Sequence, residues 1–282
     1  MDLGSIIVLG SLHYDIYIQS SSIPKIGETV LANEWFSKLG GKGANQAVAL
    51  RKEINNVKFV SAIGYDSFSD FLLKKLNEAR LSTDYISKIK GDSGVSVAIS
   101  NQSGDYSAVV VSGVNLEIPE VLLYNNNLWK DASFLMIQNE IKEEINIVAA
   151  KEAKKRNIKV FFNAAPAKKI NYKLFECVDI LLVNEIEAQQ LIQDNSSNFD
   201  TIASKLSNIV SKVIITLGSD GVMLCEKDNK PIHIKGYSVN VKSAHGAGDY
   251  FAGKFLLDFI RNNDFEKSIR LANKKTSEFI ST

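Results

Sequence analysis

An aspartate stands directly after a Gly-Ala-Gly turn near the carboxyl end of the sequence. Gly246, Ala247 and Gly248 open a predicted helix in which apolar residues recur at helical spacing from Phe251 onward. The free N–H groups at such a helix start, together with the helix dipole, favour a bound anion. In that first turn, Asp249 can accept a proton from an attacking hydroxyl. The alternative is that Asp249 only caps the helix and complements its dipole.

A second glycine-rich segment precedes another predicted helix. Gly40, Gly41 and Gly43 surround Lys42, and Asn45 follows within the helix. The segment departs from a P-loop, because a glycine stands where Ser or Thr should follow the lysine. Lys42 and Asn45 could reach a polar ligand, or the segment could be a simple turn before a packed helix. No GxGxxG motif follows a predicted strand, which argues against a dinucleotide site.

Polar residues also follow several apolar, strand-like runs. Glu185 and Glu187 come after the run 178–183, Glu140 and Asn163 end two other runs, and the turn 216–221 is TLGSDG. Carboxyl ends of parallel strands meet at one edge, where open α/β sheets bind ligands. The two glutamates could hold Mg²⁺ through its waters, or only complement a helix dipole. Together the turns suit phosphoryl transfer, which needs positioning, charge neutralisation and a base.

Composition excludes several classes of protein. The 282 residues carry 33 Lys and Arg against 32 Asp and Glu, so a dedicated nucleic-acid binder is not expected. No apolar run approaches the roughly 20 residues of a membrane span, and no secretory signal pattern opens the chain. Cys177 and Cys225 lie in apolar runs and are predicted to be buried and reduced. We therefore expect a cytoplasmic protein with neither a membrane nor a nucleic-acid partner.

The elements that must position these residues alternate along the chain. Buried strands are predicted at 5–10 and 57–64, and strands alternate with helices from about 130 onward, which indicates a parallel sheet covered on both faces. Strands without intervening helices indicate a small β lobe inserted into a single domain spanning 1–282, with lobe strands at about 14–19, 28–39 and 94–112. Helices are predicted at 67–79, with Ser67 as the N-cap, and at 142–156, 185–193 and 198–211.

Eight motifs, in their order along the chain, resemble the ribokinase (PfkB) family of sugar kinases. The resemblance runs from about residue 5 to 275 and is most similar to the ribokinase branch. Its motifs are GSLHYD (10–15), GGKGANQA (40–47), SGVN (112–115), Gln138 to Glu140, NAAPA (163–167), NEIEA (184–188), TLGSDG (216–221) and GAGD (246–249). The resemblance implies a Rossmann-like α/β ribokinase fold with a small β-sheet lid. It also implies transfer of the γ-phosphate of ATP, with Mg²⁺, to a primary hydroxyl of ribose or a related sugar.

The resemblance also implies roles for individual residues, and a homodimer formed through the lid. Asp249 matches the catalytic base, and Glu187 matches the glutamate that supports magnesium. The anion hole matches Gly246, Ala247 and Gly248. The sugar contacts match His13, Asp15, Gly41, Lys42, Asn45, Glu140 and Asp249. The nucleotide contacts match Asn184, Thr216, Gly218, Gly221, Gly248 and Asn273.

Three departures from the family pattern keep alternatives open. His13 replaces the usual Asn, which puts a preference for ribose in question. Ser243-Ala244-His245 replaces the usual Asp-Thr-Thr, so potassium activation is not expected, and His245 either adds positive charge beside the anion hole or packs as a neutral ring. The chain ends at Thr282, before a segment that family members usually carry, so a more open ATP pocket or weakened function is expected. The alternatives are a nucleoside kinase and a catalytically weakened sugar- or nucleotide-binding protein.

Overall fold

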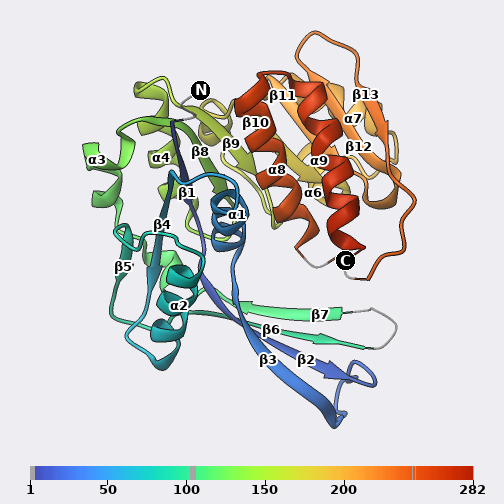
Figure 1. Cartoon of the computed structure of the whole chain (residues 1–282). Coiled ribbons are helices and arrows are strands. Elements are labelled where there is room, and N and C mark those ends of the chain that lie inside the picture. Colours follow the sequence, from blue (N-terminus) through green and yellow to red (C-terminus); the bar gives the residue numbers. More distant parts are fainter. Residues whose placement is uncertain (1–3, 102–105, 243, 245, 282) are drawn as a thin grey trace.

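The protein consists of one large sheet wrapped by helices and one small sheet beside it (Figure 1). The computed structural model describes residues 4–101, 106–242, 244 and 246–281. Within those ranges, no helix combines the length and the apolar composition that crossing a membrane would require.

The large sheet is mainly parallel, as predicted. Its strands lie in the order β13-β12-β11-β10-β9-β8-β1-β4-β5, and neighbours are parallel from β11 to β5, whereas β12 and β13 are antiparallel. The carboxyl ends of the parallel strands therefore share one edge. The strand bounds are β1 (Ser5–Leu9), β4 (Val57–Ile63), β5 (Ile86–Lys88), β8 (Ala132–Gln138), β9 (Lys159–Asn163), β10 (Ile180–Asn184), β11 (Lys212–Thr216), β12 (Gly221–Glu226) and β13 (Ile232–Lys235).

Helices cover both faces of this sheet. One face carries α1 (Lys42–Arg51), α2 (Ser67–Glu78), α8 (Ala247–Asn262) and α9 (Phe265–Ile280). The other face carries α3 (Asn126–Trp129), α4 (Glu143–Lys155), α5 (Tyr172–Phe175), α6 (Glu185–Ile192) and α7 (Phe199–Ser207). Short 3₁₀ turns are η1 (Gly113–Glu117), η2 (Glu120–Tyr124) and η3 (Gly218–Asp220).

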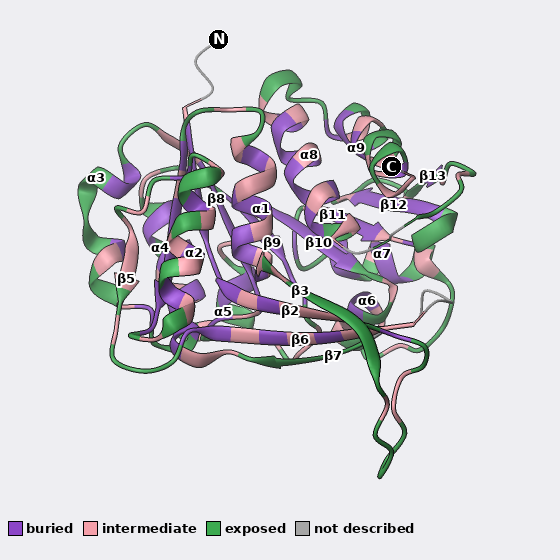
Figure 2. Cartoon of the chain, turned by 60° about the horizontal axis from the view of Figure 1, so that its bottom comes forward, coloured by how far each residue is buried: buried purple, intermediate pink, exposed green. Residues whose placement is uncertain are grey.

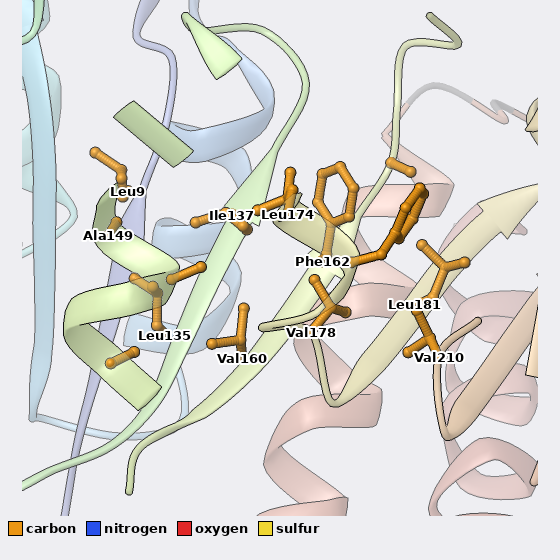
Figure 3. Packing of buried hydrophobic residues seen from close by; sticks show 14 of the residues in the cluster. Leu9, Leu135, Ile137, Ala149, Val160, Phe162, Leu174, Val178, Leu181 and Val210 are labelled. Atoms are coloured by element: carbon orange, nitrogen blue, oxygen red, sulfur yellow. The ribbon is translucent and has the colours of Figure 1, made fainter. Parts of the chain in front are cut away.

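The continuous apolar strands are explained by these two helical layers. In β1, Ile7 and Leu9 point into one core while Ile6 and Val8 point into the other. Each such side chain contributes roughly 1.5–3 kcal/mol when it leaves water. Figure 3 shows part of the core on the α4 face, where the labelled side chains are Leu9, Leu135, Ile137, Ala149, Val160, Phe162, Leu174, Val178, Leu181 and Val210.

Several predicted boundaries need correction. The N-cap of α2 is Asp66 rather than Ser67, because the Asp66 carboxylate accepts hydrogen bonds from the backbone N–H groups of Phe68 (3.0 Å) and Ser69 (2.9 Å). Helix α7 ends at Ser207, not near 211, since the chain turns there toward β11. Both cysteines are free, but Cys177 is only half-buried, whereas Cys225 is buried as predicted.

The small sheet has the strand order β3-β2-β6-β7 and extends from the carboxyl edge of the large sheet (Figure 1). Its outer pairs are antiparallel, and the central pair β2–β6 is parallel. The strand predicted to begin at 28 begins at Ala32 instead, because a turn with hydrogen bonds between Lys25 and Glu28 occupies the preceding residues. The strand bounds are β2 (His13–Ser20), β3 (Ala32–Gly40), β6 (Gly94–Ser100) and β7 (Tyr106–Val111).

Two short connections join the small sheet to the core. Three residues separate β1 from β2, and Gly41 alone separates β3 from α1. The first turn of α1 packs directly on the connection after β1, since a Cβ on Gly43 would lie 2.7 Å from the Cα of Gly10. This close packing holds the start of α1 against the carboxyl end of β1.

Candidate active site

Asp249 lies in the first turn of α8, at the carboxyl edge of the large sheet. Gly246 caps the helix with φ at +75°, a left-handed conformation that suits glycine. A Cβ added to Gly246 or Gly248 would meet no atom of the described residues within 4 Å, so none of these residues fills the space in front of this turn. The Ala247 N–H donates to the Ala244 carbonyl (3.2 Å). The Asp249 side chain itself is 7% exposed.

The beginning of α1 supplies hydrogen bonds to this carboxylate. The Asn45 Nδ2 donates to one Asp249 oxygen (3.2 Å), and the Gln46 Nε2 donates to the other (2.9 Å). Residues about 200 positions apart in sequence therefore meet at the packed starts of α1 and α8. Each oxygen of a buried carboxylate needs such donors, because an unpaired charge in the interior is costly.

Glu140, just beyond β8, joins two further segments. Its carboxylate accepts hydrogen bonds from the backbone N–H of Lys42 (2.8 Å) and from the Ser11 hydroxyl (2.5 Å). Gly41 takes φ at +89° beside this contact, and a Cβ there would lie 2.8 Å from the Ser11 carbonyl oxygen. The predicted residues Gly41, Lys42 and Glu140 are thus brought together at the root of the small sheet.

Asp15 extends from β2 toward the same region. Its carboxylate accepts a hydrogen bond from the Ser96 hydroxyl of β6 (2.5 Å), and Gly40 leaves room for it, since a Cβ there would lie 1.9 Å away. Burial raises the pKa of Asp15 to about 6; the Ser96 hydrogen bond opposes this rise, and the charges of Glu140 and Asp249 add to it.

His13 occupies a closed space on the same strand. It is 2% exposed, and its Nε2 has no hydrogen-bond partner among the described residues. Gly94 of the adjacent β6 makes room for the ring, because a Cβ there would lie 2.3 Å from its Cδ2. Burial lowers the pKa of His13 and outweighs the opposing charge of Glu140, so the imidazole is neutral at pH 7.

Lys42 provides positive charge among these carboxylates. Burial raises the pKa of both Asp249 and Glu187, and the charge of Lys42 opposes the rise in each case. Asp249 also raises the pKa of Glu187. The two predicted carboxylates therefore share one electrostatic environment, although they come from α8 and α6.

Glu187 is held by a reciprocal cap at the start of α6. The Asn184 side chain accepts from the Glu187 N–H, and the Glu187 carboxylate accepts from the Asn184 N–H, both at 2.8 Å. Among the described residues, no group of three or more His, Cys, Asp or Glu side chains is placed to hold a metal ion. A cation at Glu187 would therefore need most of its ligands from elsewhere.

The residues predicted to contact a nucleotide lie further along the sheet edge. Thr216 ends β11, with its hydroxyl 3.4 Å from the Val183 carbonyl oxygen. Gly218 and Gly221 take φ at +53° and +100° in the turn to β12. Asn273 of α9 donates to the Lys235 carbonyl (3.0 Å) at the end of β13. A pocket of about 510 Å³ adjoins this turn, lined by Ser197, Phe199, Asp200, Leu217, Ser219, Asp220, Met223, His233, Lys235 and Gly236.

Sequence reasoning missed two buried polar residues, Gln46 and Gln138. Gln46, which donates to Asp249, and Gln138, which donates to Gln46, are both fully buried, although each lies within a motif that drew attention for other residues. The signal was present, since a glutamine facing a core needs a specific partner. Ser243 and His245, which replace family residues before the Gly-Ala-Gly turn, lie outside the described residues.

Comparison with known proteins identifies the family. Residues 4–281 match the family described as pfkB family carbohydrate kinase. The chain belongs to this family. A ribokinase of Lactococcus lactis is 32% identical over 94% of this chain and 87% of its own length. A deoxyribokinase of Salmonella typhi is 30% identical over 95% of this chain and 89% of its own length.

A solved structure agrees with the sequence relationship. The structure of Arabidopsis thaliana ribokinase complexed with ribose and ATP superimposes with a TM-score of 0.87 at 27% identity, covering 99% of this chain and 93% of that one. This pfkB-family protein is thus an ATP-dependent carbohydrate kinase with the ribokinase fold, as its motifs predicted.

The raised pKa of Asp15 predicts a stability cost. Asp15→Asn is expected to increase the free energy of unfolding at pH 7.5 by up to about 3 kcal/mol, since each unit of pKa shift corresponds to roughly 1.4 kcal/mol. The folded-state pKa is about 6 against an ordinary value of 3.8. The penalty is therefore complete well above pH 6 and shrinks as the pH falls through 6 toward 3.8, below which Asp15 is protonated in both states.

Urea unfolding of the variant and the parent at several pH values measures this difference. Asp84→Asn, at an exposed loop position, is the matched control and is expected to show little change. A stability difference for Asp15→Asn that does not vary between pH 4 and 7.5 would contradict the assignment.

Proposed function

We propose that this kinase transfers the γ-phosphate of ATP to a primary hydroxyl of ribose or a related sugar, with Asp249 as the general base. The observation that carries the proposal is the position of Asp249. It is buried in the first turn of α8, beside open space and next to the sugar-side residues Asp15 and Glu140. Relatives named ribokinase and deoxyribokinase support a pentose as substrate.

In the proposed reaction, Asp249 takes the proton of the primary hydroxyl while that oxygen attacks the γ-phosphorus. The bond to the β-phosphate oxygen breaks, and ADP leaves. First-turn N–H groups of a helix have no partner within the helix, so those of Gly246 and Gly248 can stabilise the transferring phosphoryl group. The Ala247 N–H can join them by exchanging its hydrogen bond to the Ala244 carbonyl for one to the phosphoryl oxygen. Lys42, whose charge already acts on Asp249 and Glu187, adds to this stabilisation.

Magnesium is proposed to accompany ATP at Glu187. Burial raises the pKa of this carboxylate more than the Lys42 charge lowers it, so a divalent ion beside Glu187 would further stabilise its ionised form. A single carboxylate fits an ion held chiefly by phosphates and water, the usual arrangement for Mg²⁺ with nucleotides. When bound, Mg²⁺ would neutralise charge on the phosphates. The lack of potassium activation and the cytoplasmic location stay predictions.

The nucleotide is proposed to lie along the sheet edge from α8 toward the β11–β12 turn. Thr216, Gly218 and Gly221 would contact it there, with Asn184 near the phosphates and Asn273 near the base. Glycine suits this turn, because a Cβ on Gly221 would lie 2.2 Å from the Ile234 carbonyl oxygen.

The small sheet is proposed to act as a lid over the sugar. Successive strand residues point to opposite faces, so Asp15, paired with Lys38 and Ser96, shares one face with His13. The sugar would lie against this face, where closing the lid would exclude water.

The opposite face of the small sheet is apolar and is proposed to form a homodimer. Trp35 pairs with Ile18, and Val109 pairs with Val97, so these side chains form a continuous surface. Trp35 is 65% exposed and Val109 70% exposed, and much of β3 is exposed in Figure 2. Exposed apolar patches of this kind mark interaction sites.

Two alternatives stay open. A nucleoside kinase of the same fold would need room for a base beside the sugar, and the departures from the usual pattern at His13 and at residues 243–245 allow this alternative. A protein that binds sugar or nucleotide without turnover is the other alternative. ADP release from Mg-ATP over pentoses, hexoses and nucleosides distinguishes all three.

Asp249→Asn is expected to reduce turnover by about 10²–10⁴-fold, because the variant cannot accept the proton. Sugar and ATP binding should persist, since an amide oxygen can still accept from Gln46. The matched control is Asp258→Asn, which lies in the same helix away from its first turn and should keep turnover. Near-parental ADP release by Asp249→Asn would remove Asp249 from the role of base.

His13→Asn is expected to shift substrate preference toward ribose over 2-deoxyribose by roughly five- to tenfold in kcat/KM. An amide offers both a donor and an acceptor on one flat group, whereas each nitrogen of a neutral imidazole is either a donor or an acceptor, and one hydrogen bond contributes about 1 kcal/mol. Tyr14→Phe is the control, because Tyr14 points to the other face and stacks on Phe68. An unchanged preference in His13→Asn would show that the sugar does not contact this residue.

Val109→Lys is expected to convert the proposed dimer to a monomer, since a charge would be buried in the interface. Val110→Lys places the same charge on the opposite face of β7 and should leave the mass unchanged. Sedimentation velocity over a concentration series measures both. A parent protein that sediments as a monomer would refute the proposed dimer.

A further inference from the structure

Two buried glutamines connect Asp249 to the end of β8. The Gln138 Nε2 donates to the Gln46 Oε1 (2.6 Å), and the Gln46 Nε2 donates to the Asp249 Oδ1 (2.9 Å). Both glutamine side chains are 0% exposed. The three side chains come from β8, α1 and α8, so the chain of hydrogen bonds crosses the interior between these elements.

The direction of these hydrogen bonds decides what Asp249 meets. An amide has a donor end and an acceptor end. Because Gln138 donates to the oxygen of Gln46, the nitrogen of Gln46 is left to face the carboxylate. A Gln46 amide turned the other way would place its oxygen against an ionised Asp249, and this contact is repulsive between two buried groups.

Gln138 is held where it can impose this direction. Its backbone carbonyl accepts from the Asn146 Nδ2 of α4 (2.7 Å). Its side chain lies against Gly10, where a Cβ would be 1.9 Å from the Gln138 Oε1. That oxygen has no hydrogen-bond partner among the described residues. The donation to the Gln46 Oε1 is therefore the hydrogen bond that the Gln138 side chain makes among the described residues.

We propose that Gln46 and Gln138 are positioning residues for the proposed phosphoryl transfer, Gln46 by holding the Asp249 carboxylate and Gln138 by orienting the Gln46 amide. The proposal rests on the assignment of Asp249 as the base. It goes beyond that assignment because it identifies the buried side chains that hold and orient the groups around Asp249.

The chain of hydrogen bonds from Gln138 through Gln46 to Asp249, here called the relay, can also run in the opposite direction. Once Asp249 has taken the proton, both amides can turn over. Protonated Asp249 would then donate to the Gln46 oxygen, and Gln46 would donate to the unpartnered Gln138 oxygen. In the observed arrangement, the hydrogen bonds from Gln46 and Asn45 lower the pKa of Asp249 against the effect of burial. The charged groups that act on Asp249 from other elements are Lys42, Glu140, Glu187 and Asp15.

Three variants test the relay: Gln46→Met, Gln138→Met and the double variant. Methionine keeps the unbranched shape and removes the hydrogen bonds. Gln46→Met is expected to lower kcat about ten- to hundredfold and to move the acidic limb of the kcat/KM pH profile upward. Gln138→Met should shift both quantities in the same direction by less. The double variant should be no worse than Gln46→Met, because Gln138 acts through Gln46.

Asn146→Leu is the matched control. It removes a buried amide hydrogen bond to the same residue, Gln138, but leaves the relay in place. Its acidic limb should match that of the parent even where its melting temperature falls. Gln46→Glu provides a second variant of native shape, and its carboxylate should move the acidic limb further upward than methionine does.

Other outcomes would overturn the proposal. If the fold-decreases in kcat of the two single variants multiply in the double variant, the two glutamines act independently. A fall in melting temperature with an unmoved pH profile would show a merely structural role. Asp249→Asn distinguishes a failure of the relay from a failure of the assigned base. If it is inactive while Gln46→Met is fully active, the relay alone is wrong; if it keeps turnover, the assignment of the base is wrong.

Discussion

The burial of the Asp249 carboxylate is the constraint on which the rest of this site depends. A charge with so little access to water must be met by donors, and these come from α1, a helix about 200 residues away in sequence. Their meeting requires α1 to start immediately at the carboxyl end of β1, which the packing of Gly43 on Gly10 allows. The close packing that Gly43 allows thus serves the contact between the two helix starts.

Charge in the site is unbalanced in a way that suits the proposed reaction. Asp15, Glu140, Glu187 and Asp249 act on one another, with Lys42 as the cation that opposes several of these interactions. Burying ionised carboxylates beside one another costs free energy of folding: the pKa of Asp15 is raised to about 6 chiefly by burial, and the charges of Glu140 and Asp249 add to the rise. In the proposed function, sugar hydroxyls and a magnesium ion would supply further donors and positive charge to these carboxylates.

The two faces of the small sheet have different chemistry, which follows from strand periodicity. One face carries His13 and Asp15 toward the site, and the other carries Trp35 and Val109 outward. A single register therefore determines both the polar lining and the apolar surface, and a slip by one residue would exchange them. This arrangement connects the proposed sugar contacts to the proposed dimer.

The sequence by itself determined the type and order of the main elements, because continuous apolar strands and helical spacing are local patterns. Eight ordered motifs were enough to predict the family, which the comparisons confirm. Local signals failed where polar groups compete: the carboxylate of Asp66 caps α2 more effectively than Ser67, and a turn before Ala32 delays β3. The roles predicted for individual site residues stay predictions.

Only the tertiary structure decided which polar side chains meet. Gln46 and Gln138 lie 92 positions apart, so no local pattern connects them, yet their contact orients the donor that faces Asp249. The same holds for Ser96 on Asp15 and for the unpartnered Nε2 of His13. The physical reason is that periodicity reports which side of an element is buried, whereas a hydrogen bond depends on where two separate elements place their atoms within a few tenths of an ångström.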